Sequence, residues 1–166
     1  MAEVVALVDY GAGNLHSVHN ALKAAGAQGV RVTSDPDTVR AADRIVLPGV
    51  GAFGACAAGL RAIPGLVEAM EERVQVGGAP FLGICVGMQL LADRGLEHGV
   101  TRGLGWVPGE VRLIERTDPA IKVPHMGWND VVPTHHRDGA RLIAPGEAYF
   151  LHSYHFQPDD GRHIAA

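Results

Sequence analysis

Short apolar runs alternate with stretches of helical spacing over the first half of the chain. From Asn14, a residue type that favours helix N-caps, Leu15, Val18 and Leu22 recur on one helix face until Gly26 ends the pattern. The same reading predicts strands over Val4–Val8, 30–33, 45–47 and 81–84, and further helices over 56–60 and 66–76. Strands that alternate with helices predict a mostly parallel sheet with helices on both faces.

The pattern changes after about Gly95, where loops rich in proline, glycine and histidine replace the helices. Strand-like segments are expected over 111–114, 131–132 and 149–153. We interpret them as antiparallel strands that extend the same sheet, because no linker or low-complexity segment separates the two halves. Residues 1–166 are therefore expected to form a single domain of the α/β class.

Composition and charge narrow the range of partners. There are 14 basic and 18 acidic residues, and the formal net charge is −4. No basic cluster occurs, so we expect no nucleic acid partner. No apolar run approaches the ~20 residues of a membrane-spanning helix, so no membrane is expected either. Cys56 and Cys85 are expected to be free thiols in a reducing compartment, which predicts a cytoplasmic protein.

The candidate chemistry lies where the strand predicted over 81–84 meets a helix. Gly83, Cys85 and Gly87 form a Gly-x-Cys-x-Gly sequence, the pattern of a nucleophile elbow with cysteine in place of serine. The glycines relieve the crowding of a sharp strand-to-helix turn, which exposes the sulfur above the carboxyl ends of the strands. The backbone N–H of Val86 would then donate to an oxyanion. The alternative is a buried structural cysteine.

A glycine-dense loop over 48–54 directly follows the strand predicted over 45–47. Alone it would be an ordinary tight turn, but beside the elbow we interpret it as the second half of an oxyanion hole. Two other patterns are weaker. Gly11 and Gly13 lack the third glycine of a dinucleotide motif, because His16 stands in its place. The histidine pairs have no spacing specific enough to predict a metal site: His16 and His19, His135 and His136, His152 and His155.

The elbow resembles the nucleophile segment of class I (triad) glutamine amidotransferases. Four further segments, 9–15, 48–54, 124–129 and 149–154, resemble the glutaminase subunits of imidazole glycerol phosphate synthase, from histidine biosynthesis. The resemblance spans the chain from residue 4 to its end. It implies a flavodoxin-like fold with an open, mostly parallel sheet, and it implies no flavin, nucleotide, metal or other cofactor.

The resemblance also implies roles for individual residues. Cys85 would attack the side-chain amide of L-glutamine, release ammonia and leave a thioester that water cleaves. The N–H groups of Val50, Gly51 and Val86 would stabilise the oxyanion, and Gln89 would cradle the substrate. Ammonia would pass to a (β/α)₈-barrel cyclase subunit. The face toward that partner would comprise Pro124, Met126, Trp128, Asn129, Tyr149 and His152.

Members of this family complete a catalytic triad with a His-Pro-Glu segment and a final helix, and no His-Pro-Glu occurs in this sequence. The fold is therefore expected to be incomplete at its C-terminus, with apolar surface exposed. Three explanations fit: a truncated chain without competent catalysis, a partner that supplies the missing elements, or His152 or His155 acting as a substitute base. Two other functions stay open: a silent docking subunit for the cyclase, and a different cysteine hydrolase of the flavodoxin-like class.

Overall fold

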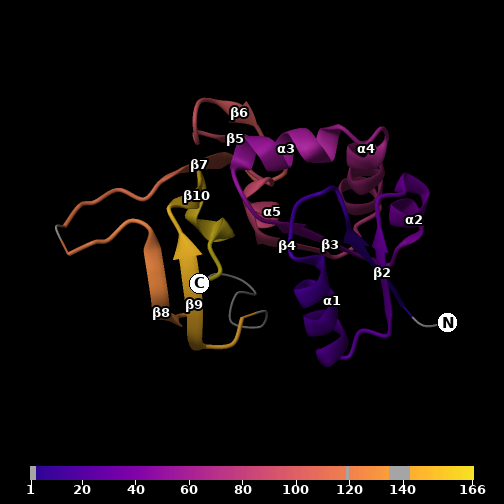
Figure 1. Ribbon diagram of the computed structural model, residues 1–166, viewed down its shortest axis with the longest axis horizontal. Coiled ribbons are helices and arrows are strands. Elements are labelled where there is room, and N and C mark those ends of the chain that lie inside the picture. The colour runs from indigo at the N-terminus through magenta and orange to yellow at the C-terminus, as the bar shows by residue number, and fades with distance from the viewer. Residues whose placement is uncertain (1–2, 119, 135–142) are drawn as a thin grey trace.

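The larger lobe of the molecule is built on a parallel sheet. The computed structural model describes residues 3–118, 120–134 and 143–166. Four strands lie in the order β2-β1-β3-β4, all parallel (Figure 1). Their bounds are β1 (Val4–Val8), β2 (Gly29–Thr33), β3 (Arg44–Gly49) and β4 (Phe81–Cys85). The chain runs outward from β1 in both directions, the order of a doubly wound sheet, which confirms the predicted fold class.

Helices cover both faces of this sheet (Figure 1). Leu15, Val18 and Leu22 of α1 pack on one face, against β1 and β3. On the other face α2, α3 and α4 bury the main core, in which Phe53 and Met70 are almost completely buried. The bounds are α1 (Leu15–Ala24), α2 (Pro36–Ala41), α3 (Phe53–Arg61), α4 (Leu66–Glu71), the π-helical turn η1 (Glu72–Val76) that continues α4, and α5 (Val86–Gln89).

The face that carries α1 is the less completely covered one. A groove of about 510 Å³ lies beside α1, and its lining includes Val5, Val46 and Leu82. Leu82 of β4 is 50% exposed. Apolar surface is therefore open on this side of the sheet.

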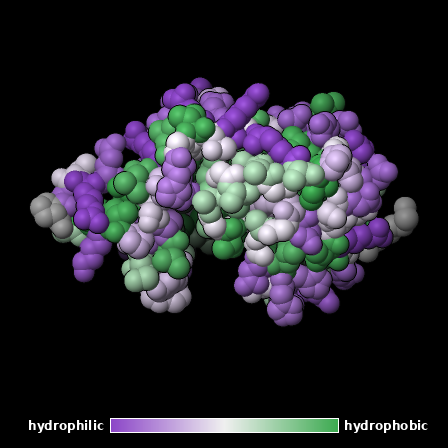
Figure 2. Space-filling model, turned by 45° about the horizontal axis from the view of Figure 1, so that its top comes forward, coloured by the Kyte–Doolittle hydropathy of each residue, from purple (hydrophilic) through white to green (hydrophobic). Residues whose placement is uncertain are grey.

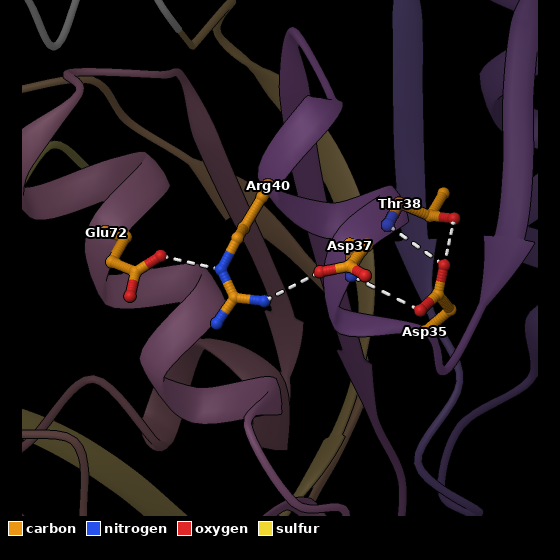
Figure 3. A network of polar contacts seen from close by, with 5 residues as sticks. All are labelled: Asp35, Asp37, Thr38, Arg40 and Glu72. Atoms are coloured by element: carbon orange, nitrogen blue, oxygen red, sulfur yellow. Dashed lines mark hydrogen bonds and ion pairs between the residues drawn. The ribbon is translucent and has the colours of Figure 1, made fainter.

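Polar contacts fix α2 against the end of α4 (Figure 3). The Asp35 carboxylate accepts hydrogen bonds from the backbone N–H groups of Asp37 and Thr38, at 3.3 and 3.1 Å, and from the Thr38 hydroxyl at 2.6 Å. It thereby satisfies donors of the first helical turn that have no partner within the helix. At the other end of α2, the Arg40 guanidinium lies 2.6 Å from the Glu72 carboxylate and 3.0 Å from that of Asp37. Arg40 therefore joins α2 to η1.

The antiparallel strands form two sheets of their own, so the expectation that they extend the parallel sheet is wrong. One sheet has the order β10-β7-β5-β6, and in the other β8 pairs with β9. Their bounds are β5 (Arg94–Gly95), β6 (Thr101–Arg102), β7 (Gly109–Leu113), β8 (His125–Val131), β9 (Gly146–His152) and β10 (Tyr154–Pro158), followed by the 3₁₀ turn η2 (Gly161–His163).

The segment after α5 explains this separation. The N–H of Leu104 donates to the Leu90 carbonyl at 2.7 Å, and the N–H of Trp106 donates to the Leu91 carbonyl at 2.9 Å. The Trp106 ring also lies edge-on to Phe81 of β4, with ring centroids 5.2 Å apart. The chain thus folds back on the end of α5, and β7 begins beside β5 instead of beside β4.

Within the described ranges, no single helix is long and apolar enough to cross a membrane. The bent pair Phe53–Arg61 and Leu66–Val76, with 95° between its two parts, passes that test by length and composition only.

Candidate active site

Cys85 stands at a sharp turn between β4 and α5. Its φ of 55° and ψ of −119° lie outside the ordinary strand and helix regions, and its side chain is exposed. The turn needs small neighbours. A Cβ at Gly87 would lie 1.9 Å from the Leu47 carbonyl oxygen, and one at Gly83 would lie 2.5 Å from the Met88 Cα. The predicted nucleophile elbow is therefore present, and its glycines are required by close backbone approach.

The glycine-dense loop lies directly beside the elbow. Gly49 is the ladder partner of Cys85, so Val50 and Gly51 leave the sheet next to the sulfur-bearing residue. Val50 is 61% exposed, and Gly51 has a φ of +108°, which favours glycine. Val86 is buried and begins α5. The structure thus brings together, at the ends of β3 and β4, the nucleophile candidate and the three residues expected to donate N–H groups.

A cavity of about 620 Å³ opens at Cys85 and is lined on its other side by residues of β9 and β10. Gln89 lies in its wall and is 8% exposed. The Gln89 side-chain amide donates to the Tyr154 carbonyl at 3.1 Å, which joins α5 to β10. The cavity therefore lies between the larger lobe and a smaller lobe that contains β8, β9 and β10. Figure 2 shows the hollow between these two lobes. Gln89 thus lines the cavity in which the substrate is expected, but its side-chain amide nitrogen already donates to the Tyr154 carbonyl.

The β8–β9 pair has two different faces, because side chains alternate along a strand. Met126 and Trp128 of β8 stand opposite Leu151 and Tyr149 of β9. The Trp128 and Tyr149 rings meet edge-on with centroids 5.7 Å apart. All four side chains are more than half exposed. They form the docking face, a name that we keep for Met126, Trp128, Tyr149 and Leu151. Of the other residues expected at a partner interface, Pro124 and Asn129 are also exposed.

His152 lies on the opposite face of the same pair, and it lines the cavity together with Tyr149, Phe150 and Leu151 of β9. His152 Nδ1 donates to the Tyr154 carbonyl at 2.9 Å, so His152 Nε2 accepts from His125 Nδ1 at 3.1 Å. The Asn129 amide nitrogen lies 3.4 Å from His125 Nε2, and Phe150 stacks on the His125 ring. Sequence reasoning missed this chain of hydrogen bonds. The alternation of residues along β8 and β9 is the only signal for it.

Three histidines line the cavity that contains Cys85: His152, His155 and His163. The first two are the substitute-base candidates. Burial, followed by the positive charge of Arg112, lowers the pKa of His155 below its ordinary value of 6.5. Neither ring forms a hydrogen bond with the Cys85 sulfur among the residues that the structure describes. The substitute-base candidates His152 and His155 therefore line the same cavity as Cys85, but neither ring is hydrogen-bonded to its sulfur among the described residues.

Metal ligation finds no support in the part of the chain that the structure describes, where no group of three or more His, Cys, Asp or Glu residues could hold an ion. His16 instead bonds with Asn20, at 3.0 Å between ring and amide nitrogens. His135 and His136 lie outside the described residues.

An elbow cysteine, a glycine-dense loop beside it and a doubly wound sheet define a class of enzyme. Residues 6–165 match the family Glutamine amidotransferase class-I, and the chain belongs to that family. A solved structure described as "Crystal structure of glutamine amidotransferase" has the same fold, with a TM-score of 0.71 at 16% sequence identity. The alignment covers 95% of this chain and 76% of that one.

Relatives of higher sequence identity carry a more specific name than the family does. The "Imidazole glycerol phosphate synthase subunit HisH" of Zymomonas mobilis subsp. mobilis is 57% identical over 161 residues, or 96% of this chain and 75% of that protein. The protein of the same name from Rhodospirillum rubrum is 53% identical over 165 residues, or 94% of this chain and 76% of that protein. The chain thus spans about three quarters of the length of these relatives.

Proposed function

We propose that this chain is a single glutamine amidotransferase domain that hydrolyses L-glutamine and supplies ammonia to the cyclase of an imidazole glycerol phosphate synthase. The single observation that carries the proposal is the exposed Cys85 at the elbow, paired through Gly49 with the loop of Val50 and Gly51. The names of the relatives support the same reaction and the same assembly.

Each element of the site has a step in this reaction. The Cys85 sulfur adds to the amide carbon of the substrate, and the carbonyl oxygen becomes an oxyanion. The N–H groups of Val50, Gly51 and Val86 stabilise that oxyanion, and one donor of this kind is worth about 3 kcal/mol. The proton taken from the thiol passes to the amide nitrogen, so that collapse of the adduct breaks the C–N bond, expels ammonia and leaves a thioester. Water cleaves the thioester to glutamate and restores the Cys85 thiol. Gln89, in the cavity wall, contacts the substrate.

The proposed reaction also needs a group that accepts the proton of the Cys85 thiol. His152 uses both of its ring nitrogens in other hydrogen bonds. His155 lines the cavity without a contact to Cys85 among the described residues. We therefore assign no base within these residues, and efficient turnover is expected to need a group from elsewhere in the assembly.

The proposed partner is a (β/α)₈-barrel cyclase subunit, which meets the docking face. Trp128 and Tyr149 are residue types that carry much of the binding energy at protein interfaces. Both are more than half exposed, and they reinforce each other by edge-on packing. Pro124, Asn129 and His152 flank this face at its edge or on its reverse side.

We also propose a cytoplasmic location and a site that works without a cofactor. Both cysteines are free thiols, which favours a reducing compartment. The proposed steps need a thiol, a proton acceptor, water and hydrogen-bond donors, and none of them uses a redox group or a metal.

A covalent probe tests the proposed function. The chain is mixed with the cyclase subunit and treated with 6-diazo-5-oxo-L-norleucine, a glutamine analogue that alkylates the attacking nucleophile. Peptide mass mapping is expected to find the label on Cys85 and none on Cys56, which is buried and serves as the internal control. The D-enantiomer should label neither residue. A complex that forms but leaves Cys85 unlabelled would favour the silent docking subunit and would reject the glutaminase.

A further inference from the structure

Two buried side chains hold the loop beside the elbow from below. Tyr10, just after β1, is 5% exposed, and its hydroxyl donates to the Pro48 carbonyl at 2.7 Å. Cys56, in the first turns of α3, is 1% exposed, and its thiol donates to the Val50 carbonyl at 3.5 Å. Neither residue has a step in the proposed reaction. Their contacts nevertheless end on the stretch from Pro48 to Gly51, which comprises the last two paired residues of β3 and the start of the loop after it.

The covalent geometry of the peptide group gives these contacts a consequence. In a planar trans peptide, the carbonyl of one residue and the N–H of the next point in opposite directions. Because the Val50 carbonyl is turned inward to Cys56, the Gly51 N–H is turned outward, away from the core. Because the Pro48 carbonyl is turned to Tyr10, the peptide before Gly49 is fixed in the same way. The intervening Gly49–Val50 peptide is thus held between two fixed neighbours.

Beyond Gly49, the last residue that the ladder holds, the backbone of the loop has little stiffness of its own. Gly51 lacks a side chain that would restrict its φ and ψ angles, and Val50 is 61% exposed. Without side-chain contacts such a loop samples several peptide orientations, and only some of them aim N–H groups at an oxyanion. Orientation of donors before the reaction is the main source of their catalytic value.

The two side chains are also suited to remain donors. Burial is the main cause that raises the pKa of Tyr10 far above its ordinary value, with the nearby Cys56 and Cys85 as further causes. Burial likewise raises the pKa of the Cys56 thiol. Both groups therefore stay protonated near neutral pH and keep the hydrogen that they donate. Gly59 of α3 makes room for Tyr10, since a Cβ there would lie 3.0 Å from the Tyr10 carbonyl oxygen.

We propose that Tyr10 and Cys56 are positioning residues, which orient the Pro48–Gly51 peptides so that their N–H groups receive the oxyanion formed at Cys85. The inference rests on the proposed glutaminase function. It adds two residues that never touch the substrate and that act through backbone carbonyls.

The test compares three variants in the complex with the cyclase. Tyr10→Phe removes one hydroxyl and keeps the buried ring. Cys56→Ala removes the thiol, and Cys56→Ser restores a donor at the same position. The first readout is the affinity for L-glutamate γ-semialdehyde, whose adduct with Cys85 carries the oxyanion. The second is alkylation of Cys85 by iodoacetamide, which needs no oxyanion donor. The third is the backbone order parameters of Val50 and Gly51 by NMR.

We expect Tyr10→Phe and Cys56→Ala to weaken aldehyde binding roughly 10- to 100-fold, the scale on which misplacement of a catalytic group acts. Iodoacetamide should react as before. The order parameters should fall from about 0.85 toward values below about 0.6. Cys56→Ser should recover part of the aldehyde affinity, which a purely structural loss of packing would not do.

Other results would overturn the inference. Unchanged aldehyde affinity in Tyr10→Phe would do so, and so would an equal loss of aldehyde binding and iodoacetamide reaction, which indicates general damage. Failure of the unaltered complex to bind the aldehyde would instead reject the proposed glutaminase. In that case the order parameters alone decide whether Tyr10 and Cys56 hold the loop.

Discussion

Gly49 and Cys85 are direct partners in the ladder of β3 and β4, and each is the last residue of its strand. This pairing places the glycine-dense loop and the elbow side by side at one edge of the sheet. The fit depends on the missing side chain, because a Cβ at Gly49 would lie 2.5 Å from the Gly87 nitrogen and 2.9 Å from the Val86 Cβ.

Replacement of Gly49 by alanine is therefore expected to push the elbow away from β3. The free energy of unfolding should fall by about 1–3 kcal/mol, the range for an overpacked core position, and labelling of Cys85 by the glutamine analogue should slow. Urea unfolding and mass mapping measure the two effects. Gly146→Ala is the matched control, because a Cβ there meets nothing within 4 Å. Equal destabilisation by the two variants would contradict the expectation.

Gln89→Ala should destabilise the contact between the two lobes. The change removes the amide that donates to the Tyr154 carbonyl at 3.1 Å, and that carbonyl keeps only the hydrogen bond from His152 Nδ1 at 2.9 Å. Loss of one such hydrogen bond costs about 0.5–1.5 kcal/mol, which urea unfolding measures. Gln157→Ala is the control, because the Gln157 amide reaches only the carbonyl of the next residue, at 3.5 Å. A larger loss in Gln157→Ala would show that the Gln89 contact has little weight.

Trp128→Ala should weaken binding of the cyclase without lowering the stability of the free chain. Truncation of a central aromatic residue at an interface typically costs at least about 2 kcal/mol, or roughly a 30-fold rise in Kd. Titration calorimetry measures this change. Val76→Ala removes an apolar side chain of η1, on the other lobe, that is 87% exposed against 70% for Trp128, and this variant should bind as the unaltered chain does. Equal Kd values for the two variants would argue against the docking face.

The Asp35 cap predicts a dependence of stability on pH. Hydrogen bonds from the Thr38 hydroxyl, and then from the N–H groups of Asp37 and Thr38, hold the pKa of Asp35 below its ordinary value of 3.8. The folded state therefore prefers the carboxylate, so this stabilisation is present at neutral pH and is lost as the pH falls through the folded-state pKa.

Asp35→Asn keeps a capping side chain that does not titrate. The unaltered chain should have the higher Tm at about pH 6, and the difference should narrow as the pH falls below about 4. Thermal unfolding followed by circular dichroism over this range measures it. A difference in Tm that stays constant down to about pH 2 would contradict the role assigned to the carboxylate.

The larger lobe and the elbow could be predicted because their signals are local. The buried strands of a parallel sheet are continuous apolar runs, and Gly83, Cys85 and Gly87 lie within one turn of chain. The prediction of a strand over 131–132 found only the end of β8. Gly127, Asn129 and Asp130 are residue types that are rare in strands, and they obscure the short alternation of Met126 and Trp128 with their neighbours.

The contacts that connect distant segments could not be predicted from a single sequence. His125 and His152 are 27 residues apart, and Tyr10 is 38 residues from Pro48. Each contact depends on a strand register or a crossover that local patterning does not specify. The separation into three sheets has the same origin, because it follows from backbone hydrogen bonds after α5 that carry no side-chain signal.

The β8–β9 pair is hydrogen-bonded to no other strand among those that the structure describes. A two-stranded ribbon is only marginally stable in water, so this ribbon opens at a lower free energy than the parallel sheet does. One face of the ribbon carries Trp128, and four residues of β9 line the cavity at Cys85: Tyr149, Phe150, Leu151 and His152. A protein bound on the Trp128 face stabilises the closed ribbon by mass action. Assembly and the completeness of the cavity wall are therefore thermodynamically linked, and the concentration of the partner sets how often the site is enclosed.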